Sequence, residues 1–292
     1  MPYLYLVSAV VLMSILNILG AGFNRTQTGK GNVTPLYNLL LVGAAFCTWA
    51  VIYAFDFSFE VKVLPYSILF GVCYAGIAIS LIKALGAGPT LLTSLLQQLS
   101  LIAVSVWGFA FWGTWDAEKA PLVLTGLALV VVSLVLSLYS GEKSDKKVTW
   151  KWIGYAVVMF VVTAGCSIVQ KAQQIAFDGK HGAMLMFFGV LVAVLVCFVN
   201  FLIGEKPNVR QTVKIALPYS VGAGTSSALG NLFVILLATS RLSPNLIYPT
   251  LAVGCLAVTS IACVVLFKEK FAWWQWIGVF IGAVAVAMLS IV

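Results

Sequence analysis

Two stretches of the chain, LPYSILFGVCYAGIAISLIKAL at residues 64–85 and LPYSVGAGTSSALGNLFVILLA at residues 217–238, open with the same four letters. Each is long enough to cross a bilayer, for which a helix needs roughly 20 mainly apolar residues. Leu64 and Leu217 are 153 residues apart, and so are Gly71 and Gly224. We interpret the two stretches as copies of one membrane unit that is built twice.

The composition of the whole chain indicates that lipid is its solvent. Of the 292 residues, 62% are hydrophobic and 9% are charged, and the mean hydropathy is +1.06. A water-soluble core cannot hide that much apolar surface, so the lipid bilayer is the expected partner of the protein. The net charge of +8 comes from basic residues in the connectors, where membrane topology places them, and we expect no nucleic-acid binding.

Ten apolar windows, separated by short connectors, fill the chain. Helices are expected in all of them, because lipid cannot satisfy open backbone groups and each window is about twice as long as a barrel strand. The sequence therefore predicts an all-α integral membrane protein with ten transmembrane helices. Their approximate positions are residues 2–23, 34–55, 63–86, 89–112, 119–140, 151–177, 183–203, 213–239, 243–267 and 272–292.

The repeated residues divide the chain into two halves of five helices. Residues 1–140 form the expected first repeat, 141–150 the linker and 151–292 the second repeat. Pro89 and Pro244 are 155 residues apart, which agrees with the other offset within two residues. Because five is an odd number, the second copy must enter the membrane upside down, as in the inverted repeats of many secondary transporters.

Lysine and arginine are unevenly divided between the connectors. The odd-numbered connectors hold eleven of these residues and the even-numbered connectors hold four. Basic residues are enriched in cytoplasmic loops, so this count predicts cytoplasmic odd connectors and external termini.

Acidic residues are missing from the middle of every expected span. All nine belong to connectors or helix ends: Asp56, Glu60, Asp116, Glu118, Glu142, Asp145, Asp178, Glu205 and Glu269. Cation transport and proton coupling in lipid usually run through a buried carboxylate, and embedded phosphate chemistry needs paired carboxylates on magnesium. We therefore expect neither a proton-driven cation pump nor an enzyme, and the sequence indicates no metal site or other cofactor.

The candidate substrate-binding residues are polar side chains within the spans. The charged ones are Lys83 and Lys171, and the uncharged ones are Asn17, Tyr74, Gln97, Gln98, Thr225, Ser226, Ser227, Asn231 and Tyr248. Buried amides and hydroxyls in lipid need partners, which are either another helix or a bound solute. The two lysines are expected in opposite leaflets, where they attract an anionic group or extend to the nearer headgroups.

Gly278 and Gly282 form a G-x-x-x-G pattern in the last window. This pattern permits close helix approach, and we expect its partner to be the fifth helix of the same chain. The protein is accordingly expected to be a monomer or a weak homodimer.

The chain resembles the EamA-type branch of the drug/metabolite transporter (DMT) superfamily. The resemblance rests on the helix count, on Ala84-Leu85-Gly86-Ala87-Gly88-Pro89 before the fourth window and on Leu266-Phe267-Lys268-Glu269-Lys270-Phe271 before the tenth. Tyr248-Pro249 is similar to the Pro-containing ninth helix of the family, whereas Lys268 stands where the family has a glycine. The family usually has cytoplasmic termini, in conflict with the lysine and arginine count.

The resemblance implies a multi-pass transporter of the bacterial inner membrane that moves a small polar metabolite by alternating access. Its central cavity would be lined by the first, third, fourth, sixth, eighth and ninth helices. Related multidrug carriers use a glutamate in the first helix, where this chain offers only Ser14 and Asn17. The substrate class expected here is neutral, zwitterionic or anionic.

An alternative substrate is a quaternary ammonium compound such as choline. An aromatic cage can replace a carboxylate in binding such a cation, because the ring faces attract positive charge. The candidate cage residues are Trp49, Tyr74, Trp107 and Tyr248.

Overall fold

The computed structural model describes residues 2–26, 33–87, 90–112, 118, 120–138, 149–203, 209–240, 242–267 and 272–289. These parts of the chain are helical and contain no strand. The helices are α1 (Pro2–Thr26), α2 (Thr34–Phe55), the short η1 (Val61–Val63), α3 (Leu64–Ala87), α4 (Thr90–Phe111), α5 (Ala120–Leu138), α6 (Trp150–Ala176), α7 (Gly182–Ile203), α8 (Val209–Ala238), α9 (Pro244–Phe267) and α10 (Trp273–Leu289). Their bounds follow the expected windows closely.

Eight of the described helices contain segments long and apolar enough to cross a membrane, judged by length and composition. The two shorter apolar stretches are Leu96–Gly108 in α4 and Trp273–Leu289 in α10. An apolar helix is the favoured form here because its backbone groups are paired within the segment. The protein therefore has the fold of a multi-pass helical membrane protein.

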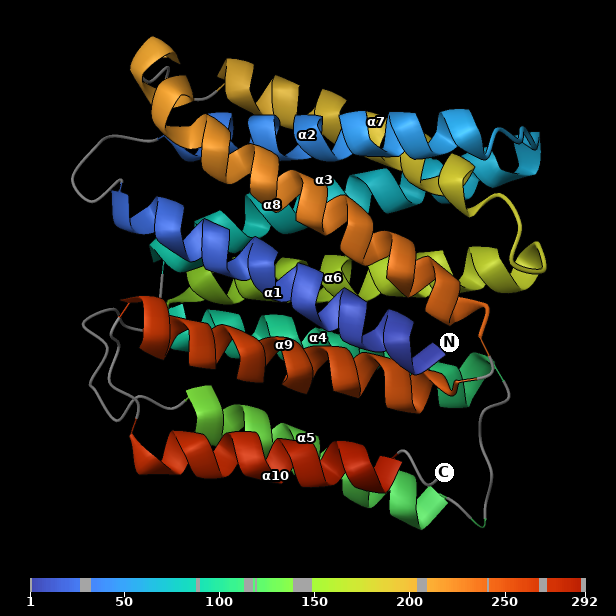
Figure 1. Ribbon diagram of the computed structural model, residues 1–292, viewed down its shortest axis with the longest axis vertical. Coiled ribbons are helices and arrows are strands. Elements are labelled where there is room, and N and C mark those ends of the chain that lie inside the picture. Colours follow the sequence, from blue (N-terminus) through green and yellow to red (C-terminus); the bar gives the residue numbers. More distant parts are fainter. Residues whose placement is uncertain are drawn as a thin grey trace.

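The helices lie side by side along one common axis (Figure 1). In this view α7 and α2 are at the top, α5 and α10 are at the bottom, and α1, α6 and α8 lie between them. The start of α1 and the end of α10 lie at the same end of the bundle, which we call the terminal end. The ends of α1 and α3 lie at the opposite end.

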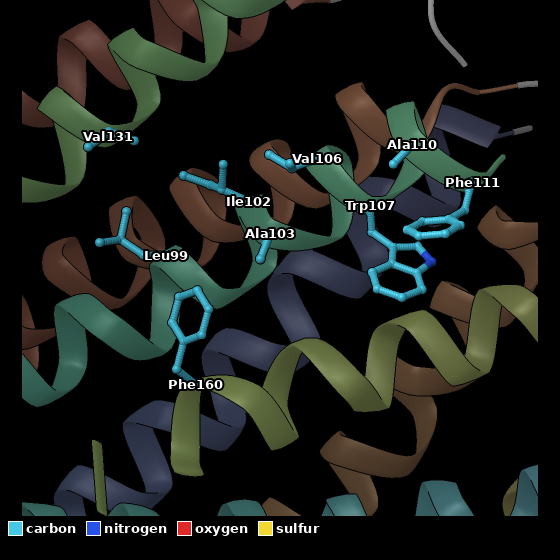
Figure 2. Close-up of a pocket in the computed structure, with 9 residues that line it drawn as sticks. All are labelled: Leu99, Ile102, Ala103, Val106, Trp107, Ala110, Phe111, Val131 and Phe160. Atoms are coloured by element: carbon cyan, nitrogen blue, oxygen red, sulfur yellow. The ribbon is translucent and has the colours of Figure 1, made fainter. Parts of the chain in front are cut away.

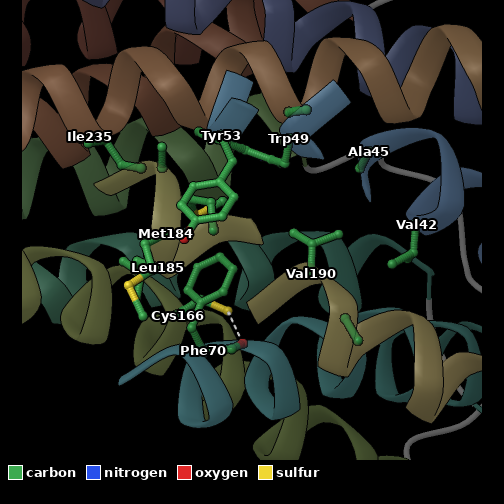
Figure 3. Close-up of a cluster of buried hydrophobic side chains, with 14 of the residues drawn as sticks. Val42, Ala45, Trp49, Tyr53, Phe70, Cys166, Met184, Leu185, Val190 and Ile235 are labelled. Carbon is green, nitrogen blue, oxygen red and sulfur yellow. Dashed lines mark hydrogen bonds between the residues drawn. The ribbon is translucent and has the colours of Figure 1, made fainter. Parts of the chain in front are cut away.

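The largest hydrophobic cluster joins α2, α3 and α7 (Figure 3). Trp49 and Phe70 are buried in it beside Met184 and Leu185, and the Cys166 thiol of α6 contacts the Phe70 carbonyl at 3.7 Å. Two further clusters lie elsewhere in the bundle, one among α1, α4, α8 and α9 and the other among α4, α5, α9 and α10. The interior is thus packed across both halves of the sequence.

Glycines allow the backbones of four helices to approach closely. A Cβ atom on Gly71 of α3 would overlap the Gly189 carbonyl oxygen of α7. A Cβ atom on Gly224 of α8 would overlap the Leu41 carbonyl oxygen of α2 in the same way. Small residues are enriched at membrane helix interfaces for this reason.

Gly278 and Gly282 of α10 face α5, as the sequence predicts. A Cβ atom on Gly278 would lie 2.5 Å from the Ser137 backbone nitrogen, and one on Gly282 would overlap the Ser133 hydroxyl. The partner of this G-x-x-x-G pattern within the described chain is therefore the fifth helix, and the prediction is confirmed.

Replacing Gly71 or Gly224 by alanine should destabilise the fold, because the added methyl group meets a backbone carbonyl that a side-chain rotation cannot move. We expect a loss of about 1–3 kcal/mol, the usual effect of overpacking. Gly43→Ala is the matched control, since a Cβ atom on this α2 glycine meets nothing within 4 Å. Thermal unfolding in detergent measures the effect, and equal melting temperatures for Gly224→Ala and Gly43→Ala would contradict it.

Candidate functional site

Polar side chains link α3 to α8 through one hydrogen bond, and a second bond lies beside it within α8. The Tyr74 hydroxyl lies 2.8 Å from the Ser227 hydroxyl, and the Asn231 side-chain amide donates to the Ser227 carbonyl at 2.9 Å. Tyr74 and Asn231 are half-buried. Three of the predicted binding residues, Tyr74, Ser227 and Asn231, are therefore brought together.

The spacing of the linked residues is informative. Tyr74 and Ser227 are separated by 153 residues, the same offset that relates Gly71 to Gly224. The hydrogen bond thus joins equivalent positions of the two similar stretches. The sequence offers this signal in the repeat offset, although the contact itself is visible only in the structure.

Tyr248 of α9 forms a second polar contact, on the other side of α6. Its side chain is 2% exposed, and its hydroxyl donates to the Ser167 carbonyl at 3.4 Å. Burial of a tyrosine hydroxyl is costly without such a partner. Tyr248 consequently fixes α9 against α6, a contact that the sequence analysis missed because it is made by a backbone carbonyl.

Three predicted amides are accessible rather than buried. Asn17 of α1 is exposed, and Gln97 and Gln98 of α4 are half-buried. Within the described part of the chain, no hydrogen bond is recorded for these three side chains. Their amide groups are therefore open to a solute or to water.

The two lysines lie far apart, as expected. Lys83 is exposed, and its Nζ lies 5.8 Å from the centroid of the Tyr155 ring near the start of α6. Lys171 lies 16 residues further along α6 than Tyr155, which corresponds to about 24 Å at 1.5 Å per residue. One solute of metabolite size cannot contact both ammonium groups in this structure.

Lys171 is 9% exposed and donates a hydrogen bond to the Ala238 carbonyl at the end of α8. Its neighbours Gln170, Gln173 and Gln174 are also buried. Gln173 donates to the Lys180 carbonyl at 2.9 Å, in the connector between α6 and α7. The polar end of α6 is thus packed inside the protein.

The described acidic residues lie at the ends of the bundle or in connectors. Asp56, Glu118 and Asp178 are exposed and Glu60 is half-buried, while the other five acidic residues lie outside the described residues. No group of three or more His, Cys, Asp or Glu side chains suited to a metal ion occurs among the described residues.

The four aromatic residues proposed for a cation cage lie in different places. Trp49 is fully buried in the cluster of α2, α3 and α7, against which Tyr74 packs, whereas Tyr248 belongs to the cluster of α1, α4, α8 and α9. Trp107 stacks on Phe111 with 4.2 Å between ring centroids and lines a separate apolar pocket. The structure does not assemble these residues into one cage.

The pocket beside Trp107 lies between α4, α5 and α6 and has a volume of about 540 Å³ (Figure 2). It is lined by nine apolar residues: Leu99, Ile102, Ala103, Val106, Trp107, Ala110, Phe111, Val131 and Phe160. Of the predicted binding residues, this lining includes the cage candidate Trp107 and none of the polar candidates. A surface of this kind suits contact with hydrocarbon rather than with a polar solute.

Comparison with known proteins shows the fold alone. No family model and no curated protein matches the chain. A solved crystal structure, whose description names no function, aligns with a TM-score of 0.69 at 14% sequence identity and covers 99% of this chain and 96% of that chain. The chain therefore shares its helical architecture with a protein of known structure over nearly its full length.

The Tyr74–Ser227 contact should be measurable as a coupling energy. A double-mutant cycle with Tyr74→Phe and Ser227→Ala removes one hydroxyl at a time, and we expect a coupling of about 0.5–1.5 kcal/mol, the net value of one hydrogen bond. Equilibrium unfolding in mixed micelles provides the free energies. Tyr74→Phe with Ser80→Ala is the control cycle, because Ser80 bonds to the Gly76 carbonyl of its own helix. Additive effects in both cycles would show that the contact adds no stability.

Proposed function

We propose that this chain is a secondary transporter of a small polar organic metabolite that is neutral, zwitterionic or anionic. The observation that carries the proposal is the polar chain of Tyr74, Ser227 and Asn231, placed where equivalent positions of two similar stretches meet. Solute sites of inverted-repeat transporters lie near the bilayer midplane at the repeat interface. Asn17 on α1 and Gln97 and Gln98 on α4 provide further accessible amides within apolar helices.

The proposal includes ten membrane spans in two inverted repeats, α1 to α5 and α6 to α10. Packing supports it, because equivalent pairs of helices make equivalent contacts: α1 packs on α8 as α6 packs on α3, and α2 packs on α8 as α7 packs on α3. The paired close approaches at Gly71 and Gly224 obey the same relation. Figure 1 shows α1 and α6 running in opposite directions, as an inverted second copy requires.

The proposed mechanism is alternating access, in which the two repeats rock around the central polar groups. The carrier is proposed to lie in the bacterial inner membrane and to belong to the EamA-type branch of the drug/metabolite transporter superfamily. The absence of a carboxylate from the described interior favours an uncharged, zwitterionic or anionic solute over a simple cation. Chemical catalysis has no support from the described polar groups.

The first experiment is a thermal-shift screen of the purified protein against a metabolite library that includes choline. A solute that binds only the folded form raises its melting temperature by mass action. Stabilisation by choline, and not by polar or anionic metabolites, would favour the quaternary ammonium alternative. Flux of the identified solute into proteoliposomes then tests transport directly, and flux at the background of empty liposomes would refute it.

Replacing Gln98 or Asn231 by leucine should abolish uptake of that solute and leave the fold intact. The leucine has a similar size but cannot hydrogen-bond, so we expect a loss of at least about tenfold in initial rate, since a factor of ten corresponds to one good polar contact. Asn200→Leu is the matched control, because this amide lies on α7, at the edge of the bundle (Figure 1). Unchanged kinetics in Gln98→Leu and Asn231→Leu would remove both residues from the site.

A further inference from the structure

The packing of the two halves is not fully symmetric, because several helix pairs pack in one half and not in the other. One of these differences involves α6 and α8, which both end at the terminal end of the bundle. Helix α6 packs on α8. The equivalent pair in the other half is α1 and α3, and these two helices show no comparable packing in the described part of the chain. Because the two halves are similar, a contact that one half makes in this structure is open to the other half in an alternate arrangement.

The α6–α8 contact is made by a charged group on a helix end. Ala238 is the last residue of α8, so its carbonyl lacks a partner within the helix. The backbone amides that follow bond elsewhere, Thr239 to the Ile235 carbonyl and Ser240 to the Leu237 carbonyl. The Lys171 ammonium donates a hydrogen bond to this Ala238 carbonyl. A positive charge at the end of a helix is also favoured by the helix dipole.

This contact closes the terminal end of the bundle. Both α6 and α8 end on the side where α1 begins (Figure 1). Lys171 lies eight residues beyond the midpoint of α6, Trp150–Ala176, and therefore about 12 Å toward that side. Gln170, Gln173 and Gln174 are buried around it, and Tyr248 and Ser167 hold α9 against α6 one turn deeper.

The opposite end of the polar region is accessible. In α1, Leu6, Val10 and Met13 recur at helical spacing and pack in the core, and Asn17 continues the same stripe. Asn17 is nevertheless exposed, so the space that it faces is open. Gln98 on α4 is also partly exposed, and both residues lie about 4 Å beyond their helix midpoints toward the connectors that follow α1 and precede α4.

We propose that the hydrogen bond from Lys171 to the Ala238 carbonyl is the latch of a gate that closes the terminal end while the path to Asn17 is open. The inference rests on the proposed transport function. In the alternate state α6 and α8 separate at the latch, and α1 and α3 pack together at the opposite end. The lysine and arginine count places the open end, which carries the odd connectors, in the cytoplasm.

Thiol labelling in lipid nanodiscs tests the latch, because both faces are then reachable by a charged, membrane-impermeant maleimide. Asn17→Cys probes the open path, and Ala238→Cys probes the latch without removing its carbonyl. Mass spectrometry of the individual peptides separates these sites from the six native cysteines. With Lys171 intact, we expect Asn17→Cys to react faster than Ala238→Cys by on the order of tenfold or more. One charged hydrogen bond is strong enough to maintain a difference in labelling rate of this size.

Adding Lys171→Met should raise the labelling rate at Ala238→Cys by about tenfold and lower the rate at Asn17→Cys, because opening one end of an alternating carrier closes the other. Lys171→Arg keeps a donor and should change both rates less. A general loosening of the fold would raise both rates together, and that result would overturn the latch, as would no change at Ala238→Cys.

Lys171→Gln provides a second variant if Lys171→Met does not fold, because it removes the charge and keeps a shorter donor. Equal labelling of Asn17→Cys and Ala238→Cys beside an intact Lys171 would refute the closed terminal end without any further variant. Absence of solute flux in proteoliposomes would instead refute transport and leave the labelling result standing, so the two failures are distinguishable.

Discussion

Lipid offers no hydrogen-bond partner to a backbone amide or to a polar side chain, and the rest of this structure follows from that constraint. The backbone groups are paired within helices throughout the described chain. Several serine and threonine hydroxyls donate to carbonyls of their own helix, as Ser14 does to the Val10 carbonyl and Thr163 to the Met159 carbonyl. Other polar groups bond between helices, as the Tyr74 hydroxyl of α3 does with the Ser227 hydroxyl of α8.

Three of these interhelical contacts involve α3, α6, α8 and α9. The Tyr74–Ser227 pair lies where the two similar stretches cross, and Tyr248 binds α9 to α6. Lys171 joins α6 to the end of α8. Gly71 and Gly224 allow α3 to lie close to α7 and α8 to lie close to α2.

Much of this arrangement was predictable because lipid imposes strong local rules. The helix windows follow from length and hydropathy, and the partner of Gly278 and Gly282 follows from the short distance that a glycine surface allows. Tyr74 could be named as a site candidate because it is a polar residue in the middle of an apolar span, and the structure adds that it bonds to Ser227, 153 residues further along. The cation cage was not predictable in the same way, because Trp49, Trp107 and Tyr248 are aromatic residues whose surroundings depend on helix rotation, and the structure disperses them.

The sequence by itself determined that the chain is helical, that lipid surrounds it and that acidic groups stay near the ends of its helices, because each of these depends on composition within one segment. Only the tertiary structure decided which polar residues meet. Whether Lys171 reaches toward headgroups or an internal carbonyl depends on where α8 ends beside it, and whether Asn17 is covered depends on how α1 sits against its neighbours. Contacts of this kind are set by the packing of distant helices, which no single stretch of sequence specifies.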